Sequence, residues 1–262
     1  MDDYSEFKAA QKKGWAFFAP LEVLTTAPAA KLVSFARVAR GQRVLDVGSG
    51  TGVIAVTAAR AGARVTALDL TPELLEVGRQ NAQLAAVEIE FREGDVEALP
   101  FADAEFEVVL SQFGHMFAPR PEVAIREMLR VLRPGGTIAF STWPPELFMG
   151  RMFALTARYA PPPPAGVAPP PQWGDANVVR ERLGGAVRDV TFDRATLLNP
   201  VLSPAHHRLQ SERYAAPVRR LVESGEPDKV AQFRREYEAL AAEYFDCNVV
   251  RMDFLMTRAV KA

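Results

Sequence analysis

The sequence has a single cysteine, no long hydrophobic run and almost no net charge. Cys247 therefore cannot form a disulfide within the chain. No apolar stretch approaches the roughly 20 residues that a helix needs to span a bilayer, and residues 1–13 (MDDYSEFKAAQKK) contain no apolar signal region. The 31 basic and 32 acidic residues give a formal net charge of -1, which provides no sequence-wide attraction to nucleic acid or to an anionic membrane. We expect a cytoplasmic protein whose partner is a small molecule, with no nucleic acid and no membrane.

Histidine is also scarce, with three residues at positions 115, 206 and 207. They are not accompanied by a cluster of cysteines or carboxylates with ligand spacing, so we expect no metal site. Adjacent residues on a helix point in different directions, so His206 and His207 cannot easily face one ligand. The sequence gives no indication of the oligomeric state.

The 262 residues, 48% of them hydrophobic, are enough for one large α/β core with an appended cap. Short β-branched runs alternate with helical patterns between residues 43 and 143, which is typical of βαβ units. The predicted strands are RVLDVG (43–48), RVTALDL (64–70), EIEFREGD (88–95), FEVVLSQF (106–113) and GTIAFSTW (136–143). Such crossovers are almost always right-handed, so we predict a doubly wound, Rossmann-like, mostly parallel sheet of seven strands.

Two further alternating runs, 187–198 and 248–262, supply the last two strands of this sheet. We divide the chain into a helical N-terminal cover (1–40), a ligand-binding core (41–145) and a C-terminal cap region (146–262) with a helical insert at 203–246. The proline-rich stretch 158–175 is either a stiff surface connector or a rim of the substrate pocket.

The stretch VLDVGSGTG (44–52) places glycines 48, 50 and 52 directly after the first predicted strand. Glycines allow the backbone to turn sharply and to approach a ligand closely, although a plain tight turn would also use them. Asp69 ends the second predicted strand, where a carboxylate can accept hydrogen bonds from a ribose diol. In an open α/β sheet, ligands lie beyond the carboxyl ends of the strands, so these residues should surround one crevice.

A dinucleotide fingerprint would require glycine at position 53, where this chain has Val53. The loop also has Asp46 at its edge and no Lys or Arg from residue 44 to 59, which suits a pyrophosphate poorly, although backbone amides alone can bind phosphate. A nucleoside that carries an ammonium and a sulfonium suits these carboxylates better, and S-adenosyl-L-methionine is such a ligand. An NAD-dependent oxidoreductase remains the alternative.

Four motifs, VLDVGSGTG, VTALDLTPELLEVGR, FREGDVEALPF and REMLRVLRPGGTIAFSTW, occur in this order between residues 40 and 143. In order and spacing they resemble the class I S-adenosylmethionine-dependent methyltransferases, and most closely the branch that includes the ubiquinone and menaquinone biosynthesis C-methyltransferases. The resemblance implies an enzyme that uses S-adenosyl-L-methionine as its cofactor.

The resemblance also assigns roles by position. It places the methionine end at Asp46 and at the backbone of Gly48, Ser49, Gly50 and Gly52. It implies that Asp69 holds the ribose hydroxyls. It also implies that Leu70 packs on the adenine, that Asp95 accepts a hydrogen bond from the adenine amine, and that Val96 offers its backbone amide to the ring. Finally, it implies that Ser111 and Gln112 lie near the transferable methyl group.

Methyl transfer from a sulfonium needs a general base only when the acceptor must lose a proton. His115, directly after the fourth predicted strand, is the candidate base, and a role in the pocket wall is an equal alternative. We expect a small, partly apolar acceptor, with methylation at carbon or oxygen favoured. A non-catalytic protein that binds S-adenosylmethionine or S-adenosylhomocysteine would share the same cofactor motifs.

Overall fold

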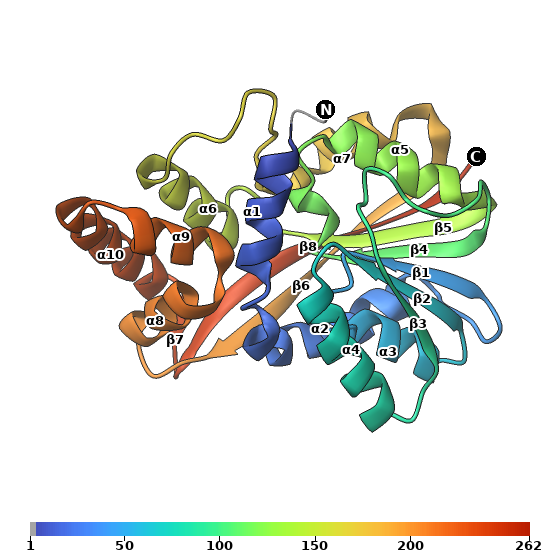
Figure 1. Cartoon of the computed structure of the whole chain (residues 1–262), viewed down its shortest axis with the longest axis horizontal. Helices are drawn as coiled ribbons and strands as arrows, with labels where there is room; N and C mark the ends of the chain where they lie inside the picture. Colours follow the sequence, from blue (N-terminus) through green and yellow to red (C-terminus); the bar gives the residue numbers. More distant parts are fainter. Residues whose placement is uncertain (1–3) are drawn as a thin grey trace.

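A computed structural model describes residues 4–262 and has one mixed sheet with helices on both faces (Figure 1). Its main strands run in the order β3-β2-β1-β4-β5-β8-β6, and a two-residue strand, β7 (Phe245–Asp246), pairs with β8. The other bounds are β1 Arg43–Val47, β2 Arg64–Asp69, β3 Ile89–Glu93, β4 Phe106–Gln112, β5 Leu132–Thr142, β6 Val187–Pro200 and β8 Val249–Lys261. The predicted doubly wound, mostly parallel sheet is confirmed.

The strand order reverses between β1 and β4, which lie side by side in the centre of the sheet. Both strands are buried along almost their whole length, as expected for parallel strands covered on both faces. The loop after β1 leads into α3, and the loop after β4 leads into η2 and α5. The fold therefore opens a crevice at their carboxyl ends, where ligands of such sheets bind.

Helices α3, α4 and α5 connect the first parallel strands, and two α-helices with a short 3-10 helix between them precede β1. The bounds are α1 Ser5–Trp15, η1 Ala19–Leu21, α2 Glu22–Phe35, α3 Val53–Arg60, α4 Pro72–Leu84, η2 His115–Phe117 and α5 Pro121–Val131. The α3 helix ends before Gly62, whose φ of 89° lies in the left-handed region. Thr71 occupies the N-cap of α4, but its hydroxyl makes no capping bond to the helix.

The C-terminal part of the chain builds a cap on a long two-stranded ribbon. Helices α6 (Phe148–Tyr159), η3 (Pro170–Gly174), α7 (Ala176–Leu183) and η4 (Gly184–Ala186) lead into β6. Helices α8 (Pro204–Tyr214), α9 (Ala216–Ser224) and α10 (Pro227–Ala242) then lie between β6 and β8. Figure 1 shows α8, α9 and α10 together at one end of the molecule, with α1 between them and the sheet.

The ribbon extends beyond the carboxyl edge of the parallel sheet. The last residue of β5, Thr142, pairs with Leu255, and Leu255 in turn pairs with Arg194 on β6. Five residues further along β6, Asn199 pairs with Val250, where β5 no longer runs alongside. At the rise of an extended strand, this places Asn199 about 16 Å past the end of β5.

One strand boundary was predicted wrongly, and one short strand was not predicted. The sequence predicted a strand that begins at Gly136, but β5 begins at Leu132, which pairs with Phe106 before the register shifts. The short strand β7 was not predicted, because two residues are too few for a periodic pattern. Within the described residues, no single helix is long and apolar enough to cross a bilayer; α1 with η1 and α2 passes only as a pair bent by 62°.

Candidate active site

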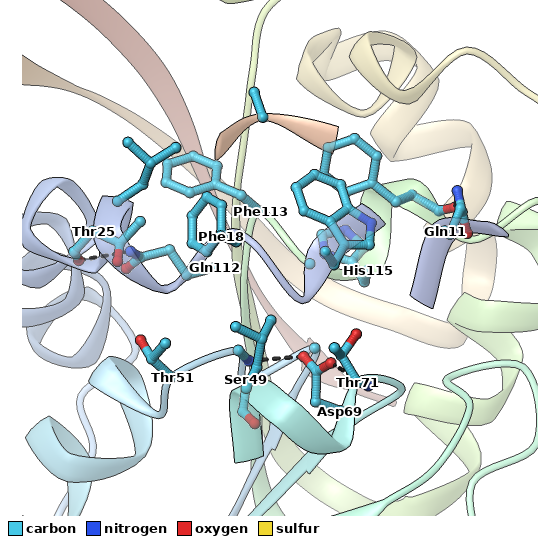
Figure 2. Close-up of a pocket in the computed structure, with 18 of the residues that line it drawn as sticks. Gln11, Phe18, Thr25, Ser49, Thr51, Asp69, Thr71, Gln112, Phe113 and His115 are labelled. Atoms are coloured by element: carbon cyan, nitrogen blue, oxygen red, sulfur yellow. Dashed lines mark hydrogen bonds between the residues drawn. The ribbon is translucent and has the colours of Figure 1, made fainter. Parts of the chain in front are cut away.

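One pocket lies at the carboxyl ends of β1, β2 and β4, between the sheet, α1 and the cap. It is lined by Gly48, Ser49 and Gly50 of the glycine loop and by most of the other residues predicted from sequence, whereas the predicted Gly52 does not line it and lies next to Phe91. In Figure 2, Ser49 and Asp69 face Gln112, Phe113 and His115 across this pocket.

The glycine loop depends on backbone conformations that other residues rarely adopt. Gly48, Gly50 and Gly52 have φ values of 64°, 54° and 78°. Gly48 also contacts the loop after β4, because a Cβ atom added at Gly114 would lie 2.5 Å from the carbonyl oxygen of Gly48. This contact brings the two ligand-facing loops together, and Gly114 was not predicted as a site residue.

Asp46 is buried beneath the glycine loop and is only partly satisfied. Its Oδ2 accepts a hydrogen bond of 3.1 Å from the Ala55 amide, whereas its Oδ1 has no partner within residues 4–262. Burial raises the pKa of Asp46 to about 8, the Ala55 amide opposes this shift, and the nearby charge of Asp69 adds to it. A ligand cation near Oδ1 would supply the missing partner and favour the ionised carboxylate.

Asp69 ties the first two βα loops together at the same edge (Figure 2). Its Oδ2 accepts from the Gly50 amide at 2.7 Å and its Oδ1 accepts from the Thr71 amide at 2.8 Å. Burial raises the pKa of Asp69, and hydrogen bonds from the Gly50, Thr71 and Leu70 amides and from the Thr71 side chain oppose the shift. Hydroxyl groups of a ligand would share the carboxylate oxygens with these donors. Leu70 lines the pocket next to it.

Asp95 and Val96 also line the pocket, but Asp95 is already engaged by a residue of α1. Lys8 Nζ lies 2.7 Å from Asp95 Oδ2 and 2.6 Å from Glu97 Oε2. The Glu97 side chain is buried and also pairs with Arg120 at 2.7 Å. The N-terminal helix is therefore fixed to the floor of the pocket by ion pairs, which the sequence analysis did not predict.

The end of β4 contributes one wall, and its residues differ in what they face. Ser111 is fully buried; its hydroxyl donates to the Val47 carbonyl at 2.6 Å and accepts from the His115 amide at 3.1 Å. It therefore positions the loop instead of lining the pocket as expected. Gln112 does line the pocket: its Nε2 donates to the Thr25 carbonyl at 2.7 Å, and its Oε1 has no partner within the described chain.

Phe113 follows in a left-handed conformation, with φ of 61°, and stacks on Trp143 at a centroid distance of 4.0 Å. Such a conformation is costly for an aromatic residue and is concentrated at functional sites. It turns the chain so that Gly114 meets the glycine loop, and it places the Phe113 ring in the pocket.

His115 lies in the pocket wall, with its ring between Phe140 and Trp173 at centroid distances of 4.6 Å and 4.8 Å. Both ring nitrogens are shielded and make no hydrogen bond within residues 4–262. Burial, and then the charge of Arg182, lowers the pKa of His115 to about 3. Of the two roles left open by the sequence, this geometry favours the wall over the general base.

The proline-rich stretch divides into an exposed part and a buried part, and none of residues 158–175 lines the pocket. Residues 161–166 are exposed, as in a surface connector. Trp173 in η3 is fully buried against His115 and accepts, through its carbonyl, a hydrogen bond from the Thr142 hydroxyl at 2.8 Å. The second part therefore supports the pocket wall from behind.

Beyond the glycine loop the pocket becomes mainly apolar. Side chains of α1, the β4 loop, α6, the ribbon and α9 line this part, among them Trp15, Phe18, Phe117, Met149, Met152, Phe153, Leu197, Val218 and Met252. His207 also lines the pocket. Its neighbour His206 instead accepts, through Nδ1, a hydrogen bond from the Leu202 amide outside the helix.

The polar groups near the glycine loop fit S-adenosylmethionine. Asp46 Oδ1, Ser49 Oγ and Gln112 Oε1 are buried atoms without partners in the part of the chain that the structure describes. Asp46 suits an ammonium group, the positive-φ glycines allow close backbone approach, and Asp69 suits a ribose diol. Residues 4–262 contain no group of three or more His, Cys, Asp or Glu residues that could hold a metal ion.

Comparison with known proteins agrees with this fit. The methyltransferase domain family matches residues 45–140. The uncharacterized protein Rv1403c of Mycobacterium tuberculosis is 37% identical over 235 residues, which cover 88% of this chain and 85% of that protein. Demethylmenaquinone methyltransferase of Renibacterium salmoninarum is 45% identical over 98 residues, 37% of this chain and 40% of that enzyme. The solved YcgJ protein of Bacillus subtilis has the same fold, with a TM-score of 0.63 at 18% identity, over 90% of this chain and 98% of that one.

Proposed function

The chain belongs to the class I S-adenosylmethionine-dependent methyltransferases, and on this premise we propose that it methylates a carbon or oxygen atom of a small, partly apolar acceptor. The methyl group would pass from sulfur to the acceptor by in-line displacement. The thioether leaves as a neutral molecule, and the acceptor releases a proton if it carries one at the attacking atom.

The observation that carries this proposal is the continuity of the pocket. The same cavity contains the glycine loop with Asp46 and Asp69 at one end and an apolar chamber at the other. Apolar chambers with few polar groups are typical of sites for small molecules. The net charge of -1 gives no long-range attraction to a polyanion, which also favours a small acceptor over nucleic acid.

When bound, S-adenosylmethionine supplies a methyl group on a sulfonium that needs no further activation. The chain would hold this cofactor through Asp46 and the glycine-loop backbone at the amino acid end and through Asp69 at the ribose. Leu70 and Val96 would flank the adenine. Because Asp95 is paired with Lys8, its contact with the adenine amine would be shared with that ion pair.

The remaining contribution of the chain would be positioning and exclusion of water. Trp15, Phe18 and Phe117 come from α1, its following turn and the β4 loop, and they line the pocket next to the glycine loop. Holding two reactants in attack geometry can supply roughly 7–11 kcal/mol of the barrier. Catalysis by positioning and exclusion of water requires no general base, which is consistent with the shielded nitrogens of His115.

The proposal can be tested in two stages. Calorimetric titration with S-adenosylmethionine, S-adenosylhomocysteine and NAD, after removal of any co-purified nucleotide, should give binding of the first two and none of NAD. Methyl transfer from labelled S-adenosylmethionine should then be measured with phenols, quinols, amines and thiols. Turnover confined to phenols and quinols supports the proposal. Turnover confined to amines or thiols contradicts the C- or O-methylation, and binding of NAD alone contradicts the cofactor.

A further inference from the structure

A chain of three hydrogen-bonded side chains lies in the cap, outside the cofactor end of the pocket. Ser211 Oγ and the Tyr237 hydroxyl are 2.6 Å apart, and the Tyr237 hydroxyl lies 2.9 Å from His207 Nδ1. His207 and Tyr237 are almost fully buried, with 3% and 1% of their surfaces exposed. His207 and Ser211 are one helical turn apart on α8, so both face Tyr237 of α10.

The hydrogen bonds among these three side chains leave one nitrogen of His207 available to a ligand. Its Nδ1 is taken by Tyr237, and its Nε2 makes no hydrogen bond within residues 4–262. Two more polar groups that line the same pocket are also open. Gln210 Oε1 is buried without a partner in the described residues, and the side-chain amide of Asn199, 4% exposed, makes no hydrogen bond there either.

The three open groups lie at the end of the pocket that is remote from the carboxyl ends of the parallel strands. Asn199 is on the part of the ribbon that runs past β5, and α8 begins directly beyond it. Leu197, Met252 and Val218 line the pocket around them. A molecule that reaches from the glycine loop to His207 must therefore have an apolar body and a polar group at its far end.

The charged side chains beside His207 are paired with one another and offer no net charge to a ligand. Arg208 pairs with Glu212 and Glu238, and Arg234 pairs with Glu212, so these charges are balanced beside the chain. Burial, and then the charge of His206, lowers the pKa of His207 to about 4, so the ring is neutral near pH 7. Lys8 is the one lysine or arginine among the described residues that line the pocket, and it is paired with Asp95 and Glu97.

We propose that His207, oriented by Tyr237 and Ser211, binds a neutral hydroxyl group at the far end of the methyl acceptor, with Asn199 and Gln210 as additional partners. The donor and acceptor roles in the hydrogen bonds among Ser211, Tyr237 and His207 can be reversed, so Nε2 of His207 can either donate or accept a hydrogen bond. A hydroxyl group can do both, and it satisfies the ring in either tautomer. This inference rests on the proposed function, because it assumes that the apolar chamber holds the acceptor.

A matched pair of probes tests the inference without knowledge of the natural acceptor. 1-Naphthol and 1-methylnaphthalene have the same apolar body and differ by a hydroxyl in place of a methyl group. Their binding to the protein saturated with S-adenosylhomocysteine would be followed by tryptophan fluorescence. The parent protein should prefer 1-naphthol by roughly tenfold or more, because a site built to hydrogen-bond a hydroxyl rejects the analogue that lacks it.

His207→Phe keeps an aromatic ring and removes both nitrogens. It should reduce the preference to about threefold or less by weakening 1-naphthol binding, with little change for 1-methylnaphthalene. His206→Ala is the matched control and should keep the full preference, because His206 is bonded to Leu202 and does not line the pocket.

The affinity for S-adenosylhomocysteine separates the possible failures. An unchanged affinity in His207→Phe shows that the variant is folded. If His207→Phe does not bind S-adenosylhomocysteine, the preference for 1-naphthol is measured instead in Tyr237→Phe, which removes the hydroxyl that orients His207. Equal binding of the two probes by the parent, or a preference that survives His207→Phe, overturns the hydroxyl site and leaves the proposed function intact. If the parent protein does not bind S-adenosylhomocysteine at all, the proposed function itself is contradicted.

Discussion

Protonation of Asp46 should control how tightly the pocket binds a ligand that carries an ammonium group. The buried carboxyl has a pKa of about 8 in the unliganded protein, with one oxygen unpartnered. S-adenosylhomocysteine presents an ammonium and needs the ionised carboxylate. Binding below pH 8 should therefore release a proton from Asp46.

The size of the effect follows from the fraction of Asp46 that is ionised before binding. With a pKa of about 8, roughly a quarter of the carboxyl is ionised at about pH 7.5 and about 1% at about pH 6. The affinity for S-adenosylhomocysteine should therefore fall about 25-fold between these two pH values, which corresponds to about 2 kcal/mol.

The assay is calorimetric titration at both pH values with two ligands. 5′-Methylthioadenosine has the same adenosine and thioether but no ammonium group. Both ligands carry the ribose that Asp69 would hold, and burial also raises the pKa of Asp69, so any pH dependence due to Asp69 should be common to both. The difference between the two ligands isolates Asp46. Titration in two buffers with different ionisation enthalpies should give close to one additional proton released with S-adenosylhomocysteine at the lower pH.

Asp46→Asn is the matched variant. It should abolish the difference in pH dependence between the two ligands. If the two ligands lose affinity in parallel in the parent protein, the assignment of Asp46 to the ammonium is refuted.

The same variant has a predicted effect on stability. The pKa of Asp46 is higher in the folded protein than in the unfolded chain, so Asp46 ionises at a lower pH in the unfolded chain. The free energy of unfolding of the parent therefore falls as the pH rises from about 4 to about 8. Unliganded Asp46→Asn should therefore have a higher melting temperature than the parent at about pH 7.5. The gap should close as the pH falls toward 4.

Three further substitutions test other parts of the site. Asp69→Ala should weaken S-adenosylhomocysteine binding on the order of 100-fold, from two lost charged hydrogen bonds of roughly 1.5 kcal/mol each; unchanged affinity in calorimetry would exclude the ribose assignment. Gly114→Ala should cost about 1–3 kcal/mol in urea unfolding, because its methyl group would collide with Gly48. Gly185→Ala, with open space around it, should be close to neutral; equal losses for both would contradict the loop contact. His115→Leu should leave the pH dependence of kcat unchanged from about pH 6 to 9, since burial lowers the pKa of His115 to about 3; a limb that disappears in the variant would restore His115 as a base.

The parts of the site that could be predicted from sequence are those encoded by local patterns. A β-branched run, three glycines and a carboxylate at the end of the next strand suffice to locate Asp46, the glycine loop and Asp69. The topology of parallel strands then brings these residues to one edge, which the structure confirms for the fold. The cofactor could be predicted for the same reason.

The remaining features depend on contacts between residues far apart in the sequence. Gly114 meets Gly48 and Lys8 meets Asp95 only after the chain has folded, and neither pair has a spacing signal. His206 and His207 are adjacent, and only the packing of α8 on α10 determines that His207 is buried in the pocket. Ser111 has a residue type suited to ligand contact, yet its hydroxyl is used to connect two strands and a loop.

The ribbon of β6 and β8 has a consequence for how such an enzyme can diversify. One stretch of β8 is held in the sheet between β5 and β6, and the stretch from Val249 to Phe254 extends past it with β6. If the apolar chamber holds the acceptor as proposed, substitutions in the projecting stretch and its three helices would reshape that chamber while the glycine loop, Asp46 and Asp69 stay in place. Acceptor selectivity and cofactor affinity would then reside in separable parts of one chain, and mutation would change the acceptor without loss of the methyl donor.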